Sequence, residues 1–237
     1  MIDLFITGVE QNIDKYYLTA GLTAVMQSLG YSCGVYKPVC LDTFEKDEIL
    51  QSYGLSFVKF IDPFIKTYFS YILKKDCSPL ISAAKEHLTI EKNVILKDFQ
   101  SIQEINEILI VEGIAGLTTP LNKNFLEEDI AKILDLPLLL VASAKNPSVN
   151  NIILSVNRAK EQGMNLRGII LNDYLKQSTD VNVKLMPRLI EEYTDTELLG
   201  TLSPFEKTIN TNDLITEIIN NINVESIFKI KIPKLNV

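Results

Sequence analysis

The segment from Gly8 to Tyr16 (GVEQNIDKY) holds the residues whose types and spacing connect most directly to chemistry. It lies between a short apolar run and a long helical pattern, where a nucleotide-binding α/β protein places its phosphate-binding loop. Lys15 stands at the position of the phosphate-binding lysine. Asp14 stands where a glycine would precede that lysine, and Tyr16 stands where a serine or threonine would follow it. The segment therefore predicts a phosphate-binding loop that has kept its lysine and lost its glycine and hydroxyl.

Other polar side chains follow apolar runs elsewhere in the chain. Lys37 lies near the end of the run 32–39, Glu112 ends a run that starts at residue 108, and Asn172 with Asp173 ends a third run. Each of these alone would be an ordinary solvated surface residue. If the runs are parallel strands, their carboxyl ends meet at one edge of a sheet, which is where such sheets bind ligands. These residues are therefore predicted to share one site with the loop lysine.

The elements that must position these residues alternate along the chain. We expect buried strands over residues 2–7, 32–39, 108–116, 136–144, 166–173 and 197–204, and helices over residues 15–29, 79–87, 148–162, 182–193 and 211–222. Strands that alternate with helices are typical of right-handed parallel crossovers. The sequence thus predicts a single α/β domain over 1–237, a doubly wound, mostly parallel sheet flanked by helices with a P-loop NTPase-like fold. Residues 41–92 are less regular, and 224–237 are predicted as a C-terminal extension or edge strand.

The composition limits the classes of function. The chain has 237 residues, a formal net charge of −7 and a pI near 4.9, which disfavours general binding to nucleic acid or anionic membranes. The three cysteines form no CxxC pair and there is one histidine, so no structural zinc site is expected and the thiols fit a reducing cytosol. No uninterrupted apolar run reaches the roughly 18–20 residues of a transmembrane helix. We expect a cytoplasmic protein with neither nucleic acid nor a membrane as partner.

The order of these segments resembles the dethiobiotin synthase family of P-loop-type enzymes. That family opens with a strand leading into G-T-x-T-x-V-G-K-T and continues through Y/L-K-P-V and V-E-G-A-G-G with a nearby P-L. It then has a strand–helix step containing I-N and a strand ending in N. The corresponding segments here read GVEQNIDKY, YKPV, VEGIAGLTTPL, SVNN and LND, and SPLISAA (78–84) resembles a further S-P-x-x-x-A stretch. The match runs in order across most of residues 1–205.

The resemblance implies a reaction of biotin biosynthesis. The family carboxylates 7,8-diaminopelargonate with CO₂, phosphorylates the carbamate with Mg-ATP, and closes the ureido ring with loss of phosphate. It therefore implies a ligase that uses ATP and Mg²⁺ and acts as a homodimer. Cationic groups suit this chemistry, because a carbamate anion and a triphosphate must be brought together.

The resemblance also implies roles for individual residues. Lys15 corresponds to the P-loop lysine and Lys37 to the lysine at the carbamate and γ-phosphate, so both would be catalytic. Asp47 and Glu112 would hold Mg²⁺ through carboxylate oxygens. The implied binding positions are Gly8, Lys15, Glu112, Asn172 and Asp173 for the nucleotide, and Gln11, Lys37, Leu41 and Asn150 for the substrate, with Asn150 in the helix start that closes the site across the dimer interface in the family.

Several departures from the family pattern bear on activity. A carboxylate at Asp14, about 5 Å from a phosphate, would be repelled by roughly 3 kcal/mol at an effective dielectric of about 20, which lowers affinity on the order of a hundredfold. The phenol of Tyr16 cannot reach the point where a threonine hydroxyl holds Mg²⁺. Pro147 has no N–H to offer a substrate carboxylate. Other departures are Gln11, Asn12, Leu41 and Ser203. We therefore predict weakened Mg-ATP binding.

The sequence leaves three interpretations open. The first is a dethiobiotin synthase that tolerates the unusual loop. The second is a non-catalytic or repurposed homologue, in which Asp14 or Glu10 pairs with Lys15 or Lys37 and fills the phosphate site. The third is a distant relative such as a partition-type ATPase or a corrinoid amide ligase. It is the least favoured, because the start of the loop offers no second lysine and an amidotransferase domain is not expected.

Overall fold

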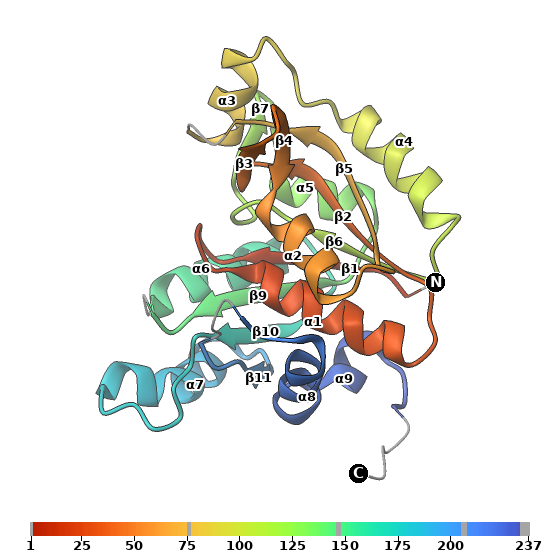
Figure 1. Cartoon of the computed structure of the whole chain (residues 1–237). Coiled ribbons are helices and arrows are strands. Elements are labelled where there is room, and N and C mark those ends of the chain that lie inside the picture. Colours follow the sequence, from red (N-terminus) through yellow and green to blue (C-terminus); the bar gives the residue numbers. More distant parts are fainter. Residues whose placement is uncertain (1, 75–76, 146–147, 205–207, 233–237) are drawn as a thin grey trace.

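A parallel sheet forms the centre of the computed structural model, which describes residues 2–74, 77–145, 148–204 and 208–232. Within these residues the sheet has seven strands in the order β11-β10-β9-β1-β6-β2-β5 (Figure 1). Its strands are β1 (Leu4–Gly8), β2 (Cys33–Cys40), β5 (Lys66–Ile72), β6 (Ile108–Glu112), β9 (Leu138–Ser143), β10 (Leu166–Asn172) and β11 (Leu198–Thr201). The six predicted strands and the doubly wound fold class are confirmed.

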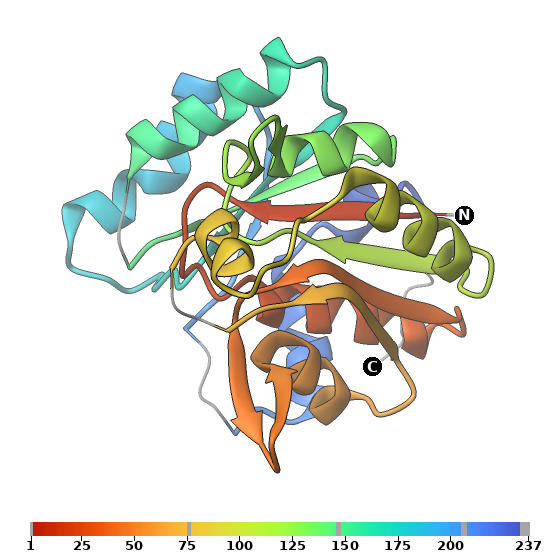
Figure 2. The ribbon, with the colours of Figure 1, turned by 90° about the horizontal axis from the view of Figure 1, so that it is seen from above.

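Helices cover both faces of the sheet, as the view from above shows (Figure 2). Alternate residues of β1 serve different layers: Leu4 and Ile6 pack with one set of helices, and Phe5 packs with the other. The first set is α1 (Lys15–Ser28), α2 (Tyr53–Ile61), α8 (Thr211–Asn221) and α9 (Val224–Phe228). The second is α3 (Pro79–Lys85), α4 (Lys92–Gln103), α5 (Glu127–Ile133), α6 (Val149–Glu161) and α7 (Val181–Thr194). In the described residues, no helix is both long and apolar enough to cross a membrane.

Several of the strands and helices that the sequence did not predict lie in the irregular region after β2. Its chain forms an antiparallel hairpin, β3 (Thr43–Lys46) and β4 (Ile49–Ser52), then α2, and then the edge strand β5. Ser52 caps α2, because its side chain accepts a hydrogen bond from the Leu55 N–H. The hairpin returns the chain to the end of β2, so α2 begins beside the strand end that carries Lys37.

Two smaller differences concern helices and the C-terminus. Helices α4 and α5 were not predicted, and a short antiparallel pair, β7 (Pro120–Asn122) and β8 (Phe125–Leu126), precedes α5. The segment 224–237 is not an edge strand in its described part, because residues 224–228 form α9 and 229–232 are irregular. Residues 233–237 lie outside the described residues.

Candidate functional site

A cavity of about 640 Å³ opens at the carboxyl edge of the sheet, between the β1–α1 loop and the ends of β2 and β6. The structure brings several predicted residues together in its wall, namely Gln11, Lys15, Lys37, Leu41 and Glu112. The parallel register accounts for the central pair, since β2 and β6 are adjacent strands and Tyr36 pairs with Val111. The residues that follow these two, Lys37 and Glu112, therefore face the same cavity.

The β1–α1 loop has a tight backbone, in which one position requires glycine and two other residues have positive φ angles. At Gly8 an added Cβ would lie 2.6 Å from the carbonyl oxygen of Glu10 and 2.7 Å from that of Ala115, so only glycine fits there. Asp14 takes the left-handed conformation, with φ 50° and ψ 40°, and Asn12 also has a positive φ of 59°. A left-handed backbone costs most non-glycine residues about 1–2 kcal/mol, and Asp and Asn tolerate it best. Asp14 and Asn12 are therefore among the residue types that tolerate this loop conformation best.

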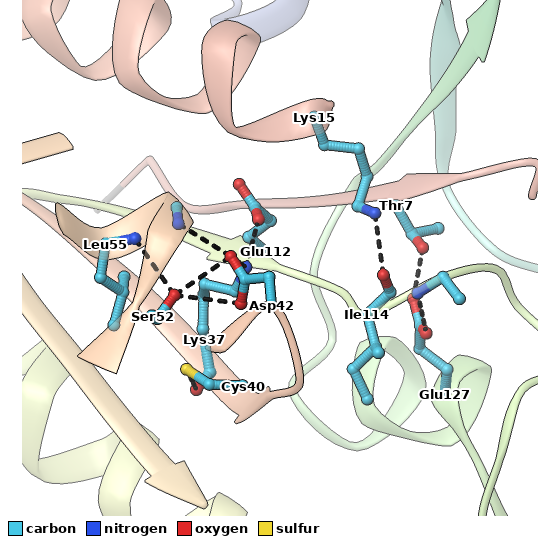
Figure 3. Close-up of polar contacts among 12 residues, drawn as sticks. Thr7, Lys15, Lys37, Cys40, Asp42, Ser52, Leu55, Glu112, Ile114 and Glu127 are labelled. Atoms are coloured by element: carbon cyan, nitrogen blue, oxygen red, sulfur yellow. Dashed lines mark hydrogen bonds and ion pairs between the residues drawn. The ribbon is translucent and has the colours of Figure 1, made fainter. Parts of the chain in front are cut away.

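Lys15 is buried at the start of α1 and turns its ammonium group toward the β6 end of the cavity. Its Nζ donates a hydrogen bond to the carbonyl oxygen of Ile114 at 2.9 Å (Figure 3). Burial lowers the pKa of Lys15, because removal from water disfavours the charged form, and the nearby carboxylates of Glu112 and Glu127 offset only part of this effect. Lys15 therefore lies in the wall of the cavity, as predicted, and a backbone carbonyl oxygen accepts one of its hydrogen bonds.

Lys37 lies between two carboxylates. Its Nζ is 2.8 Å from Oε1 of Glu112 and 2.9 Å from Oδ2 of Asp42 (Figure 3). Burial acts to lower the pKa of Lys37, but the two carboxylates outweigh it, and the net pKa is raised. Burial acts to raise the pKa of Asp42, and Lys37 outweighs it in turn, so the pKa of this carboxyl is lowered. Lys37 and Asp42 are therefore held in their charged forms.

Asp42 is anchored at the head of α2 as well as on Lys37. Its carboxylate accepts hydrogen bonds from the Gly54 N–H at 2.8 Å and from the Ser52 hydroxyl at 3.0 and 3.1 Å. These bonds explain how a residue outside any strand or helix is fixed so firmly. The suggested pairing of Asp14 or Glu10 with Lys37 is replaced by the pair with Asp42 and Glu112, and Glu10 accepts a hydrogen bond from Asn151 at 3.1 Å.

A smaller cavity of about 180 Å³ lies on the other side of the loop and contains Asn172 and Asp173. The Asn172 Nδ2 donates to the carbonyl oxygen of Ile13 at 3.1 Å, which ties the loop to the end of β10. Its buried Oδ1 has no hydrogen-bond partner among the described residues. Asp173 forms an ion pair with Lys145 at 2.8 Å and accepts a hydrogen bond from the Ser143 hydroxyl at 2.8 Å.

Tyr16 separates these two cavities and lines both of them. Its ring stacks on that of Tyr17, with centroids 4.6 Å apart, and meets the edge of Phe57 at 5.3 Å. Burial raises the pKa of Tyr16, so the phenol stays neutral. The residue that replaces the loop hydroxyl is therefore part of an aromatic cluster.

Glu127 and Asp42 are the site residues that sequence reasoning missed. Glu127, on α5, accepts a hydrogen bond from the Thr7 hydroxyl and another from the Ala115 N–H at 2.9 Å. Burial raises the pKa of this carboxyl, although the charge of Lys15 opposes the change. A Cβ on Gly113 would collide with the Glu127 carboxylate, so this glycine leaves room for it. Glu127 thus fixes the loop whose carbonyl receives Lys15.

Three predicted residues lie elsewhere. Asp47 is exposed in the turn of the β3–β4 hairpin and does not line the cavity, so its placement does not support a metal-holding role. Asn150 is exposed in the first turn of α6. Pro147 lies outside the described residues. Among the described residues, no group of three or more His, Cys, Asp and Glu side chains is arranged to hold a metal ion.

Comparison with known sequences identifies relatives of one kind. A family model described as "AAA domain" matches residues 3–227. The ATP-dependent dethiobiotin synthetase BioD of Methanococcus vannielii is 32% identical over 84% of this chain and 92% of its own length. The enzymes of the same name from Halalkalibacterium halodurans and Nitrosopumilus maritimus are 29% and 26% identical. These alignments cover 87% and 97% of this chain and 86% and 100% of the relatives.

Comparison with solved structures supports the fold alone. The MinC:MinD cell division protein complex of Aquifex aeolicus matches with a TM-score of 0.59 at 12% identity, covering 98% of both chains. A ParA family ATPase from Chlorobium tepidum matches with a TM-score of 0.57 at 11% identity, covering 97% of this chain and 92% of the other. Identities this low carry no information about a shared ligand.

Proposed function

Because the chain belongs to the dethiobiotin synthetase family, we propose that it is a dethiobiotin synthetase-type protein whose binding of Mg-ATP is strongly weakened. Its cleft would receive a diaminopelargonate-like substrate beside Lys37, and its nucleotide would lie along the β1–α1 loop. The observation that carries the proposal is the double pairing of Lys37 with Asp42 and Glu112, at 2.9 and 2.8 Å. A lysine that should meet a phosphoryl group is already neutralised from two sides.

The rest of the phosphate side also argues against tight binding of a magnesium triphosphate. Lys15 donates to the Ile114 carbonyl, and Asp14 brings a carboxylate to the loop. Glu112, the acid expected to hold the metal, is bound by Lys37, and the Tyr16 ring belongs to the aromatic cluster. As arranged, these residues do not fit Mg²⁺ and a triphosphate.

The nucleoside side of the loop is better preserved. Asn172 is one of the nucleotide-binding positions that the family resemblance implies, and its buried Oδ1 is an acceptor without a protein donor among the described residues. A buried polar group in this state gains free energy when a ligand supplies the missing hydrogen bond. The proposal therefore places the defect at the phosphates and the metal rather than at the base.

Isothermal titration calorimetry with Mg-ATP tests the proposal. We expect no saturable binding to the unmodified protein at micromolar concentrations, whereas the double variant Asp14→Gly, Tyr16→Thr gains binding by about a hundredfold. The same variant should show faster conversion of diaminopelargonate and bicarbonate to dethiobiotin. Micromolar binding of Mg-ATP by the unmodified chain would contradict the proposal.

A second candidate function is that of a repurposed homologue that no longer uses ATP. The pairing of Asp42 with Lys37 favours it, because this carboxylate comes from outside the loop and would stay in place after loop reversion. The two candidates differ in one outcome. If Asp14→Gly with Tyr16→Thr restores neither nucleotide binding nor ring closure, the site has been rebuilt and the second candidate holds.

Homodimer formation, which the family implies, is part of the proposal. The α6 helix exposes Leu154 with 59% of its surface accessible, beside a cavity of about 300 Å³ that also contains Glu10, Gln11 and Asn151. An apolar side chain at the rim of a polar cavity suits contact with a second copy. Light scattering coupled to size exclusion measures the assembly, and Leu154→Glu should shift a dimer toward monomer.

A further inference from the structure

Donors from three sources hold Asp42 in place at the edge of the large cavity. Lys37 contributes an ammonium group at 2.9 Å, Gly54 contributes its backbone N–H at 2.8 Å, and Ser52 contributes a hydroxyl at 3.0 Å. A carboxylate has about four acceptor positions, and here most of them are used. Charge-assisted hydrogen bonds of this kind are the strong ones. Asp42 is therefore a fixed part of the cavity wall.

The residue opposite Asp42 leaves room for this arrangement. A Cβ added at Gly54 would lie 2.9 Å from the Asp42 Oδ2 and 3.1 Å from the Lys37 Nζ. The first distance is shorter than real Cβ contacts, so any larger residue at position 54 would push the carboxylate or the ammonium group aside. Gly54 and Asp42 thus form a matched pair at the head of α2, which places the carboxylate on Lys37.

The charges that line the cavity show what this placement does. Two lysines, Lys15 and Lys37, face three acids, Asp14, Asp42 and Glu112, so the described wall carries one more negative than positive charge. Without Asp42 the wall would carry equal numbers of positive and negative charges. A polyphosphate that approached Lys37 would have to displace a carboxylate that is also bonded to Ser52 and Gly54, and it would meet the repulsion of that carboxylate.

We propose that Asp42 is a built-in counter-ion of Lys37 that excludes polyphosphates from the cleft and restricts it to uncharged, zwitterionic or singly charged ligands. The inference rests on the proposed function and deepens it, since it names Asp42, a residue outside the loop, as the group that keeps polyphosphates from Lys37. It differs from the effect of Asp14 and Tyr16 because it acts on Lys37 directly. It also assigns a specificity-determining role to a residue that lies outside both the β1–α1 loop and the smaller cavity.

Binding of inorganic pyrophosphate, measured by calorimetry without metal, tests this inference. Pyrophosphate has no base and needs no Tyr16 replacement, so it reports on the charge around the lysines. We expect Asp42→Asn to bind it at least tenfold more tightly than the unmodified protein, because the amide that this substitution introduces keeps an acceptor for the Gly54 N–H and loses the charge. The matched control is Glu45→Gln, which removes one charge from an exposed position of the β3–β4 hairpin, directly after Asp42, and should change the affinity for pyrophosphate less than twofold.

A second variant separates the position of Asp42 from its charge and keeps the test valid if Asp42→Asn is unstable. Gly54→Ala leaves the net charge unchanged and crowds the carboxylate away from Lys37, so it should also tighten pyrophosphate binding, by a smaller factor. The inference is overturned if neither variant binds more tightly, or if Glu45→Gln gains as much as Asp42→Asn. These variants test the inference through metal-free pyrophosphate and leave the β1–α1 loop unchanged, so they can fail while the loop reversion still raises the affinity for Mg-ATP. Micromolar binding of Mg-ATP by the unmodified protein would instead contradict both the proposed function and this inference.

Discussion

The two cavities on either side of the β1–α1 loop differ in how their buried polar groups are satisfied. On the Lys37 side, a buried ammonium group and the carboxylate of Glu112, which is only 3% exposed, are paired with each other. On the Asn172 side, a buried amide oxygen has no partner among the described residues, and the neighbouring ion pair is formed by Lys145, whose side chain is 60% exposed. On the first side the buried charged groups satisfy one another, whereas the second side offers an acceptor to a ligand.

Because of this difference, we expect the Lys37 side to contribute more to the stability of the fold and the Asn172 side to gain more from a bound ligand. An internally paired, buried site contributes to folding only as long as every charge keeps its partner. A site with an unpaired acceptor is slightly unfavourable in the free protein and gains when a donor arrives. We therefore expect substitutions to cost far more stability on the Lys37 side than on the Asn172 side.

The largest effect is expected from Lys37→Met. It leaves the Glu112 carboxylate buried without its cation, and leaving one partner of a buried pair uncompensated costs about 3–5 kcal/mol. Because Asp42 keeps Ser52 and Gly54 as donors, we place the loss at about 3 kcal/mol, near the low end. Urea unfolding monitored by circular dichroism measures it. A loss below about 1 kcal/mol would show that the pair is as weak as a surface salt bridge.

The next effect concerns pH on the same side. The pKa of Asp42 is lowered in the folded protein from an ordinary value of 3.8, so its stabilising contribution is fully present above that value and is lost as the pH falls below it. Asp42→Asn should therefore cost about 2 kcal/mol at neutral pH, typical of a charge-assisted bond, and this cost should shrink as the pH falls below 3.8. Unfolding curves of both proteins across this range measure the gap. A gap that stays constant with pH would contradict the assignment.

The sequence predicted that Lys37 and Glu112 share one site, but it predicted neither their ion pair nor the second pair, between Lys37 and Asp42. The apolar runs and the parallel order of the strands place the ends of β2 and β6 at one edge of the sheet, where Lys37 meets Glu112. Asp42 follows β2 in an irregular stretch, and it meets Lys37 only because the β3–β4 hairpin returns Gly54 to its side. That return depends on tertiary packing, which no local pattern records.

Two further residues show the same limit. Glu127 is followed by Glu128 and Asp129, and an acidic run of this kind is ordinarily a solvated helix start. Glu127 is nevertheless buried, and its carboxylate accepts hydrogen bonds from the Thr7 hydroxyl and the Ala115 N–H. The family resemblance implies a metal-binding role for Asp47, in a region of the sequence without regular strand or helix patterns. In the structure Asp47 lies in an exposed turn. Buried strands can be located from their apolar runs, whereas no such pattern shows which carboxylates outside the strands reach the site.

On the Asn172 side a much smaller change is expected from Asn172→Leu. The substitution removes the hydrogen bond to the Ile13 carbonyl, which costs about 1 kcal/mol, but it also removes the unpaired Oδ1 and adds apolar volume in a buried position. We expect a net loss of at most about 1 kcal/mol in urea unfolding. A loss as large as that of Lys37→Met would mean that the two sides do not differ in stability as the contacts indicate.

The smallest effect is expected from Lys145→Met, which removes the ion pair with Asp173 at the mouth of the smaller cavity. The Lys145 side chain is 60% exposed, and exposed pairs contribute about 0–1 kcal/mol because water and salt screen them. Asp173 also keeps the hydrogen bond from Ser143, so its charge is not left without a donor. We therefore expect a loss of stability below about 0.5 kcal/mol that shrinks further in about 0.5 M salt.

Unfolding of Lys145→Met and Lys37→Met in low and high salt gives the sharpest comparison of the two sides. Salt should remove most of the small loss of stability caused by Lys145→Met and little of the large loss caused by Lys37→Met. The reason is that solvent ions reach the exposed Lys145–Asp173 pair but not the buried Lys37–Glu112 pair.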